Sequence, residues 1–192
     1  MRITLAGHKG GIAKTTTAVH LAALLNDLAP TLLIDGDDNR SALAWQDRGP
    51  GLPCRVVDVS EAGQYAGKYS HTVIDTAARP TRAELGDLAR HCDLLILPSS
   101  PDILALHGLI ATVQTLQEIG ATNYRALLTI VPPAPSKDAA EARELLAAAE
   151  IPVFDAVIRR RAAYPRAALA GTIETTLTDY RELLQEIKTH DK

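Results

Sequence analysis

Residues 7–16 read GHKGGIAKTT, and the rest of the chain is organised around this stretch. An apolar run at 2–6 predicts a buried strand before it, and apolar residues at helical spacing predict a helix over 17–25. Glycines between a strand and a helix let the backbone approach a polyphosphate with its N–H groups turned inward, and the helix N-terminus adds positive charge. Lys14 supplies a full charge for terminal phosphates, and the Thr15 hydroxyl can bind Mg²⁺. The stretch therefore predicts a phosphate-binding loop.

The loop departs from the usual pattern G-x-x-x-x-G-K-[ST], because His8 and Ala13 occupy its two glycine positions. It matches the variant K-G-G-x-x-K-[ST] instead, which resembles the deviant P-loop of the ParA/MinD family of ATPases. The resemblance implies ATP and Mg²⁺ as cofactors. It also implies a nucleotide site formed by the loop and by one proline after a later strand, namely Lys9, Gly10, Gly11, Ile12, Ala13, Lys14, Thr15, Thr16 and Pro132.

Composition indicates an ordinary globular protein of 192 residues, with 46% apolar residues and a net charge of −3, and we expect one domain over 1–192. Such a charge does not suggest a nucleic-acid binder, so any binding of nucleic acid requires a local patch. Cys54 and Cys92 lie far apart without metal-ligand spacing and are expected to be packed thiols. The chain enters a strand at once and has no apolar run of spanning length, so we expect a cytoplasmic protein with no signal peptide and no membrane binding.

Strands and helices alternate along the chain. Apolar runs predict further strands at 31–35, 55–59, 72–75, 94–97, 127–131 and 153–158. Helices are expected at 41–46 with Ser41 as the cap, at 82–90, at 103–119 ending near Gly120, at 139–149, and as two C-terminal helices around Gly171. This alternation predicts an α/β fold, a mostly parallel sheet with helices on both faces, in the deviant P-loop NTPase architecture.

Asp35 and Asp75 each end an apolar strand, and the carboxyl ends of parallel strands form the ligand-binding edge of such a sheet. Mg²⁺ needs carboxylate and hydroxyl groups to place the ion and its waters, so Thr15, Asp35 and Asp75 are the predicted metal residues. Asp75 reads as a Walker B aspartate. By resemblance to the family's first switch loop, Asp37 orients the attacking water, which makes Lys9, Lys14 and Asp37 the predicted catalytic residues. The alternative is that these aspartates only cap turns and helices.

The resemblance extends along the chain to residues 97–102 and 158–172, and the segment 41–45 is similar to the small, ParF-like partition ATPases. Those relatives have no helix-turn-helix domain and use a separate, ParB-like adaptor protein to bind the cargo or the DNA site. Asp38 and Asn39 replace the family's Pro and Gln after the switch aspartates, and Ala77 and Ala78 replace a Pro-rich second switch. These departures leave nucleotide binding in place and the rate of hydrolysis open.

Four arginines form a basic cluster at 159–161 and 166, with no acidic residue between positions 158 and 171. Such a cluster in an acidic protein calls for an anionic partner, and the resemblance implies non-specific DNA binding by a dimer through Arg159, Arg160, Arg161 and Arg166. The alternative is that one arginine pairs with an internal carboxylate and the others are solvated. The apolar stripe of the last helix carries acidic residues on its polar face, which favours packing on the domain over membrane binding.

These features together predict a Mg²⁺-dependent ATPase that is slow and stimulated by DNA or a partner, dimerises with ATP, and positions a plasmid, chromosome region or other large cargo on the nucleoid. Lys14 already serves the near side of the phosphates, so Lys9 is expected to reach a partner's nucleotide across a homodimer. The alternative is a dethiobiotin-synthetase-like ligase on the same scaffold. An iron-protein-like reductase is disfavoured by the positions of the two cysteines, and a membrane-oscillating division regulator by the last helix.

Overall fold

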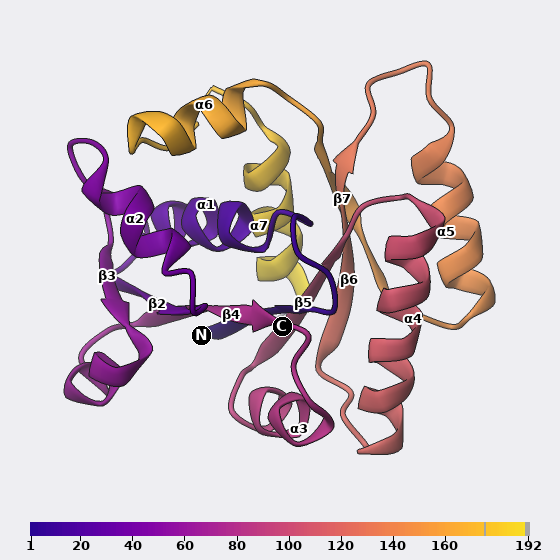
Figure 1. Ribbon diagram of the computed structural model, residues 1–192, viewed down its shortest axis with the longest axis horizontal. Coiled ribbons are helices and arrows are strands. Elements are labelled where there is room, and N and C mark those ends of the chain that lie inside the picture. The colour runs from indigo at the N-terminus through magenta and orange to yellow at the C-terminus, as the bar shows by residue number, and fades with distance from the viewer. Residues whose placement is uncertain (175, 191–192) are drawn as a thin grey trace.

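The computed structural model describes residues 1–174 and 176–190, and its centre is a seven-stranded sheet in the order β3-β2-β4-β1-β5-β6-β7 (Figure 1). Every neighbouring pair of strands is parallel, which confirms the predicted α/β class. The strands are β1 (Arg2–Gly7), β2 (Thr31–Gly36), β3 (Arg55–Asp58), β4 (His71–Ala78), β5 (Leu94–Ser99), β6 (Tyr124–Val131) and β7 (Val153–Arg159).

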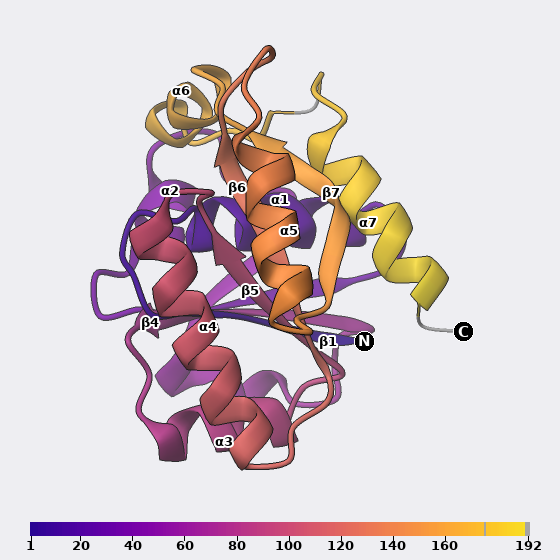
Figure 2. The same cartoon turned by 90° about the vertical axis from the view of Figure 1, so that its right-hand side faces the viewer.

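Helices cover both faces of the sheet (Figures 1 and 2). They are α1 (Lys14–Asn26), α2 (Ser41–Asp47), α3 (Arg82–Arg90), α4 (Ile103–Glu118), α5 (Asp138–Ala148), α6 (Ala163–Ala170) and α7 (Asp179–His190), with one 3₁₀ helix, η1 (Val59–Tyr65). Side chains of α1, α2, α6 and α7 share one hydrophobic core, and those of α3, α4 and α5 share another. Successive residues of a strand point to opposite faces, so Ile96 enters the first core while Leu95 and Leu97 enter the second. Both faces of the sheet are therefore buried under helices, which explains why the strands are continuous apolar runs in the sequence.

Most strands are longer than their apolar runs suggest, including β5, which continues through Pro98 to Ser99, and the excess is largest in β6 and β4. β6 begins at Tyr124, three residues before the predicted start, because Tyr124 and Arg125 pair with β5 despite their polar groups. β4 continues to Ala78 past the predicted end at 75. Strand pairing, rather than hydrophobicity, sets these limits.

Helix ends correct one prediction. Ser41 is the first residue of α2 and not its cap, since the cap position belongs to Arg40, in the left-handed region at φ 49°. Asp35, from the end of β2, takes over the capping by accepting a hydrogen bond from the Leu43 N–H at 3.0 Å. α4 ends one residue before the predicted limit, with Gly120 in the left-handed conformation (φ 75°).

The C-terminal helix packs on the domain as predicted. Its stripe of Tyr180, Leu183, Leu184 and Ile187 is buried in the core that also contains α1. No helix within residues 1–174 and 176–190 combines the length and the hydrophobicity needed to cross a bilayer.

Candidate functional site

The carboxyl ends of β1, β2 and β4 form the edge at which the phosphate loop lies. In the register of the sheet Asp75 stands beside Leu5 on one side and beside Asp35 on the other. The loop follows β1 directly and delivers Thr15 to this edge, where its Oγ1 donates a hydrogen bond to Asp75 Oδ2 at 2.6 Å. The structure thus brings together Thr15, Asp35 and Asp75, which the sequence placed in different segments.

Several backbone features hold the loop. Gly11 has φ 75°, a conformation that favours glycine, and a Cβ on Gly7 would lie 2.6 Å from the Ile12 Cδ1 atom, so a larger residue there would displace the Ile12 side chain. A Cβ on Gly10 would meet no atom within 4 Å, which leaves its backbone open to a ligand. Behind the loop, the buried Thr129 of β6 donates a hydrogen bond to the Ile12 carbonyl at 3.0 Å. Thr129 was not predicted, because only the folded sheet brings β6 to the loop.

Ala13 occupies a left-handed conformation (φ 63°, ψ 28°) immediately before α1. This explains why the common P-loop pattern has glycine here, since a Cβ costs roughly 1–2 kcal/mol in this region of φ/ψ space. We expect Ala13→Gly to raise the free energy of unfolding by about 1 kcal/mol, the relief of strain exceeding the entropy cost of glycine. Urea unfolding of the two proteins measures the difference. A variant less stable than the parent would show that Ala13 is unstrained.

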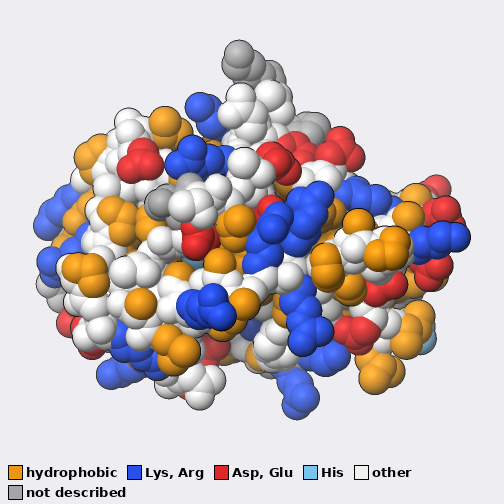
Figure 3. Space-filling model, turned by 90° about the horizontal axis from the view of Figure 1, so that it is seen from above, with side chains coloured by type: hydrophobic (Ala, Val, Ile, Leu, Met, Phe, Trp, Pro, Cys, Tyr) orange, Lys and Arg blue, Asp and Glu red, His pale blue; other side chains and the backbone are white. Residues whose placement is uncertain are grey.

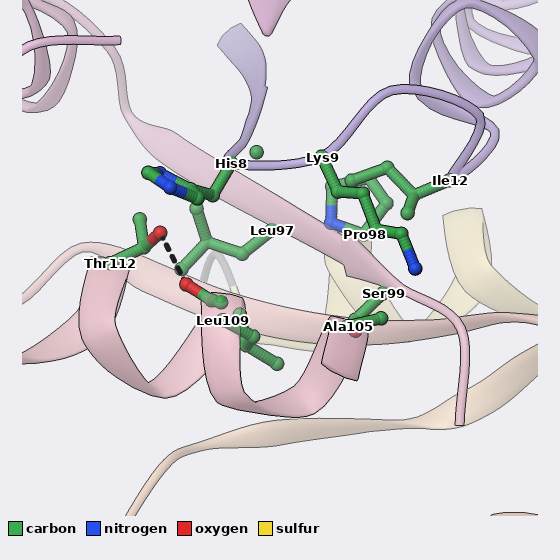
Figure 4. A pocket seen from close by; sticks show the side chains of 11 residues that line it. His8, Lys9, Ile12, Leu97, Pro98, Ser99, Ala105, Leu109 and Thr112 are labelled. Atoms are coloured by element: carbon green, nitrogen blue, oxygen red, sulfur yellow. Dashed lines mark hydrogen bonds between the residues drawn. The ribbon is translucent and has the colours of Figure 1, made fainter. Parts of the chain in front are cut away.

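The two lysines of the loop differ in environment. Lys14, the first residue of α1, is 7% exposed and lies within the loop. Lys9 is about half exposed and extends over the start of α4, where its Nζ lies 3.4 Å from Asp102 Oδ1. Figure 4 shows Lys9 reaching toward the side of Ser99 and Ala105, while the His8 ring lies on the other side near Thr112. One lysine is therefore enclosed by its own chain, and the other is presented at the surface.

Asp75 is fully buried, and within the part of the chain that the structure describes its Oδ1 has no hydrogen-bond partner. Burial raises its pKa to about 7, the Thr15 hydroxyl opposes this rise, and the negative charge of Asp35 adds to it. A cation with its waters would satisfy the free oxygen and stabilise the ionised carboxylate. Because a hydroxyl and carboxylates are the donors that Mg²⁺ prefers, the residues fit this ion.

The unusual pKa of Asp75 predicts a pH dependence. The folded protein holds this proton up to about pH 7 and the unfolded chain only to about 3.8, so stability falls as pH rises through that window, by up to about 4 kcal/mol. Asp75→Asn should lack this loss, so that the nucleotide-free variant gains on the parent from pH 4 to 8. Urea unfolding across that range measures the gain. A stability difference that stays constant with pH would contradict it.

Asp35 and Asp37 organise the loop after β2. The buried Asp35 accepts hydrogen bonds from the Asp37 N–H at 3.2 Å and from the Leu43 N–H, so it shapes the loop that carries Asp37. Its contact with a metal stays a prediction. Asp37 Oδ1 accepts from the backbone N–H and from the side-chain amide of Asn39, both at 2.9 Å. Asp38 is exposed. Asn39, which replaces the family's Gln, thus orients Asp37. The charge of Asp38, which replaces the family's Pro, faces solvent.

The four arginines separate into two kinds. Asp179, fully buried at the start of α7, accepts a hydrogen bond from the Arg159 backbone N–H at 2.9 Å, and its carboxylate also pairs with the side chains of Arg159 and Arg161 at 3.5 and 3.3 Å. Two arginines therefore pair with an internal carboxylate, where the alternative had foreseen one, although Arg159 is itself exposed and its side chain is 44% exposed. Arg160 and Arg166 are exposed. Lys and Arg side chains gather over the face that carries α6 (Figure 3).

A buried histidine joins the nucleotide loop to the C-terminal segment, which the sequence did not indicate. His20 of α1 donates from Nδ1 to the Thr16 carbonyl at 2.8 Å and accepts at Nε2 from the Glu174 N–H at 3.1 Å, so its ring is neutral. Burial lowers its pKa to about 4. The ring stacks on Tyr180 with 4.6 Å between centroids. Trp45 of α2 binds the same segment by donating to the Thr172 carbonyl at 2.8 Å.

Pro132 follows β6 at the same edge of the sheet and is half-buried. Since β6 lies two strands from β1, the chain after it borders the side of the loop away from Asp35. Its contact with a nucleotide stays a prediction.

Comparison with known proteins agrees with this geometry. Residues 3–173 match the family described as the CobQ/CobB/MinD/ParA nucleotide binding domain. The maintenance of carboxysome distribution protein A of Gloeobacter kilaueensis is 36% identical over 194 residues, which cover 93% of this chain and 90% of that protein.

Solved structures of other proteins share the fold, among them the following two. A putative plasmid partition protein of Borrelia burgdorferi B31 bound to AMPPNP superposes with a TM-score of 0.78 at 17% identity, covering 98% of each chain. The septum site-determining protein MinD of Pyrococcus horikoshii complexed with Mg-ADP gives a TM-score of 0.73 at 18% identity, covering 99% of this chain and 96% of that one. The resemblance read from the loop is thus confirmed, and the chain belongs to the CobQ/CobB/MinD/ParA nucleotide-binding domain family.

Proposed function

We propose that this protein is an ATP-hydrolysing switch that dimerises around ATP and positions a large cargo in the cell. The observation that carries the proposal is the different placement of the two loop lysines. Lys14 is enclosed at the start of α1, on the near side of the phosphates, whereas Lys9 is presented at the surface of the same loop. A lysine in that position reaches the nucleotide of a second copy more easily than its own.

Hydrolysis in this proposal depends on positioning and charge, as phosphoryl transfer generally does. Lys14 and the loop N–H groups bind the terminal phosphates, and Asp37, fixed by Asn39, accepts a hydrogen bond from the attacking water and orients it. Thr15 and Asp75 are the residues that would hold Mg²⁺, which when bound neutralises charge on the phosphates. The free Oδ1 of Asp75 and the Mg-ADP held by the Pyrococcus protein support this assignment.

The names of two similar proteins support positioning of a large cargo as the cellular function. One is named for distributing carboxysomes and another for plasmid partition, and both tasks move a large object within a cell. We propose that this chain binds DNA non-specifically as the ATP dimer and is linked to its cargo by an adaptor protein. The exposed Arg160 and Arg166 supply the DNA contacts, while Arg159 and Arg161 hold the start of α7 through Asp179.

The test is the rate of ATP hydrolysis with and without duplex DNA. The proposal predicts slow hydrolysis that DNA, alone or with the adaptor, accelerates. The competing ligase would instead hydrolyse ATP only when its small-molecule substrate is present. A rate that depends on a metabolite and is indifferent to DNA would overturn the proposal.

A further inference from the structure

Lys9 is held in its own chain by Asp102. The Lys9 ammonium lies 3.4 Å from Asp102 Oδ1, although the two residues are 93 positions apart in the sequence. Lys9 comes from the phosphate loop after β1, and Asp102 is the N-cap of α4 after β5, the next strand of the sheet. Both side chains are 49% exposed, so a partner molecule has access to the pair.

Two hydrogen bonds from its own chain orient the Asp102 carboxylate that Lys9 contacts. Its Oδ1 accepts from the Ala105 N–H at 3.0 Å, as an N-cap does, and its Oδ2 accepts from the Ser100 hydroxyl at 2.5 Å. These contacts, led by the Ser100 hydroxyl, hold the pKa of the carboxyl below its usual value, so it stays ionised at neutral pH. The cap would be complete without Lys9, and the ion pair is therefore an addition to what α4 needs.

We propose that Asp102 is the resting partner of Lys9, and that dimerisation exchanges this carboxylate for the phosphates of the second copy's nucleotide. The inference rests on the proposed function, in which Lys9 acts across the dimer. One half-exposed carboxylate attracts Lys9 weakly, because such pairs are hydrated and screened. A triphosphate presents several negative charges in a partly closed interface and therefore attracts Lys9 more strongly than Asp102 does. Lys9 returns to Asp102 when the dimer separates.

The two-fold symmetry of the dimer doubles the effect of the weak Lys9–Asp102 pair on the free energy of dimerisation. A two-fold dimer forms only after both copies release their Lys9, so the dissociation constant of the dimer contains the cost of the resting pair twice. An exposed pair corresponds to roughly a threefold bias in each chain, and hence to about ninefold in the dimer. Asp102 thus makes dimerisation depend more steeply on the triphosphate, because only a strong trans partner displaces it.

Asp102→Asn tests the proposal, since Asn keeps the cap through its amide oxygen and can donate from its amide nitrogen to the Ser100 hydroxyl, while it removes the charge. We expect the ATP dimer of Asp37→Ala/Asp102→Asn to dissociate with a constant about ninefold lower than that of Asp37→Ala, and the difference to shrink in 1 M salt. Glu118→Gln is the matched control, because it removes the same charge from the exposed Arg82–Glu118 pair on α3 and α4. It should leave the constant unchanged. Equal dimer dissociation constants for Asp37→Ala and Asp37→Ala/Asp102→Asn would overturn the proposal.

A second measurement separates this idea from the proposed function. In the nucleotide-free monomer, unfolding of Lys9→Met, Asp102→Asn and the double variant gives the coupling between the two side chains. A favourable coupling supports the resting pair, and zero coupling overturns it. A parent that stays monomeric with ATP would overturn the proposed function instead, whatever the coupling.

Discussion

Replacing Lys14 with alanine should abolish ATP binding. Lys14 is 7% exposed at the start of α1, so its charge acts on the phosphates in a partly desolvated site. A charge-assisted contact of this kind is worth about 1.5–3 kcal/mol or more, which corresponds to at least a ten- to hundredfold loss of affinity. Isothermal titration of ATP into the parent and the variant measures the loss.

The control for this experiment is Lys68→Ala, which removes an exposed lysine that follows η1, away from the phosphate loop. Its ATP affinity should equal that of the parent. Urea unfolding of Lys14→Ala shows whether the variant is folded when it fails to bind. A folded Lys14→Ala protein with affinity within twofold of the parent would refute the assignment of residues 7–16 as the phosphate loop.

The arginines should separate into two groups in DNA binding. Arg160 and Arg166 are exposed, and removing one of them from each subunit takes two phosphate contacts from the dimer. The slope of log affinity against log salt should then fall in magnitude by about 1.8. Affinity should also vary little with base sequence, because phosphate contacts carry no base information. The measurement is binding of single Arg→Ala variants to duplex DNA across a salt series, with ATP trapped by Asp37→Ala.

Arg159→Ala and Arg161→Ala provide the comparison within the same cluster. Each removes one partner of the buried Asp179, so each should lower the stability of the protein and leave the salt slope near that of the parent. If all four variants keep the parent's slope, the cluster is structural and the DNA surface lies elsewhere. If Arg159→Ala and Arg161→Ala lower the slope as much as Arg160→Ala, the inward pairing with Asp179 does not hold in the dimer.

Much of the fold follows from local patterns. The apolar runs predicted the strands, and α3 has its predicted limits of 82–90, where the structure adds a capping box of Thr81 and Glu84 around the first turn. The limits of β6 and the cap of α2 were wrong, since Tyr124 is recruited by pairing with β5 and Asp35 caps α2 from another element. Such long-range contacts leave no periodic signal in the sequence.

The site, like the fold, could be predicted from the sequence only in part. Parallel topology alone places Asp35 and Asp75 at one edge, so their closeness could be predicted from where their strands end. The contacts that refine the site could not. Thr129 behind the loop and the pairing of two arginines with Asp179 all join segments distant in the sequence, and only the packed sheet and α7 bring them together.

In the proposed function ATP joins two copies of this chain through Lys9. Light scattering of Asp37→Ala tests it directly, because this variant should bind ATP without hydrolysing it. We expect a stable dimer with ATP, a monomer with ADP, and a monomer with ATP when Lys9→Ala is added. A Lys9→Ala protein that dimerises with ATP as well as Asp37→Ala alone would contradict it.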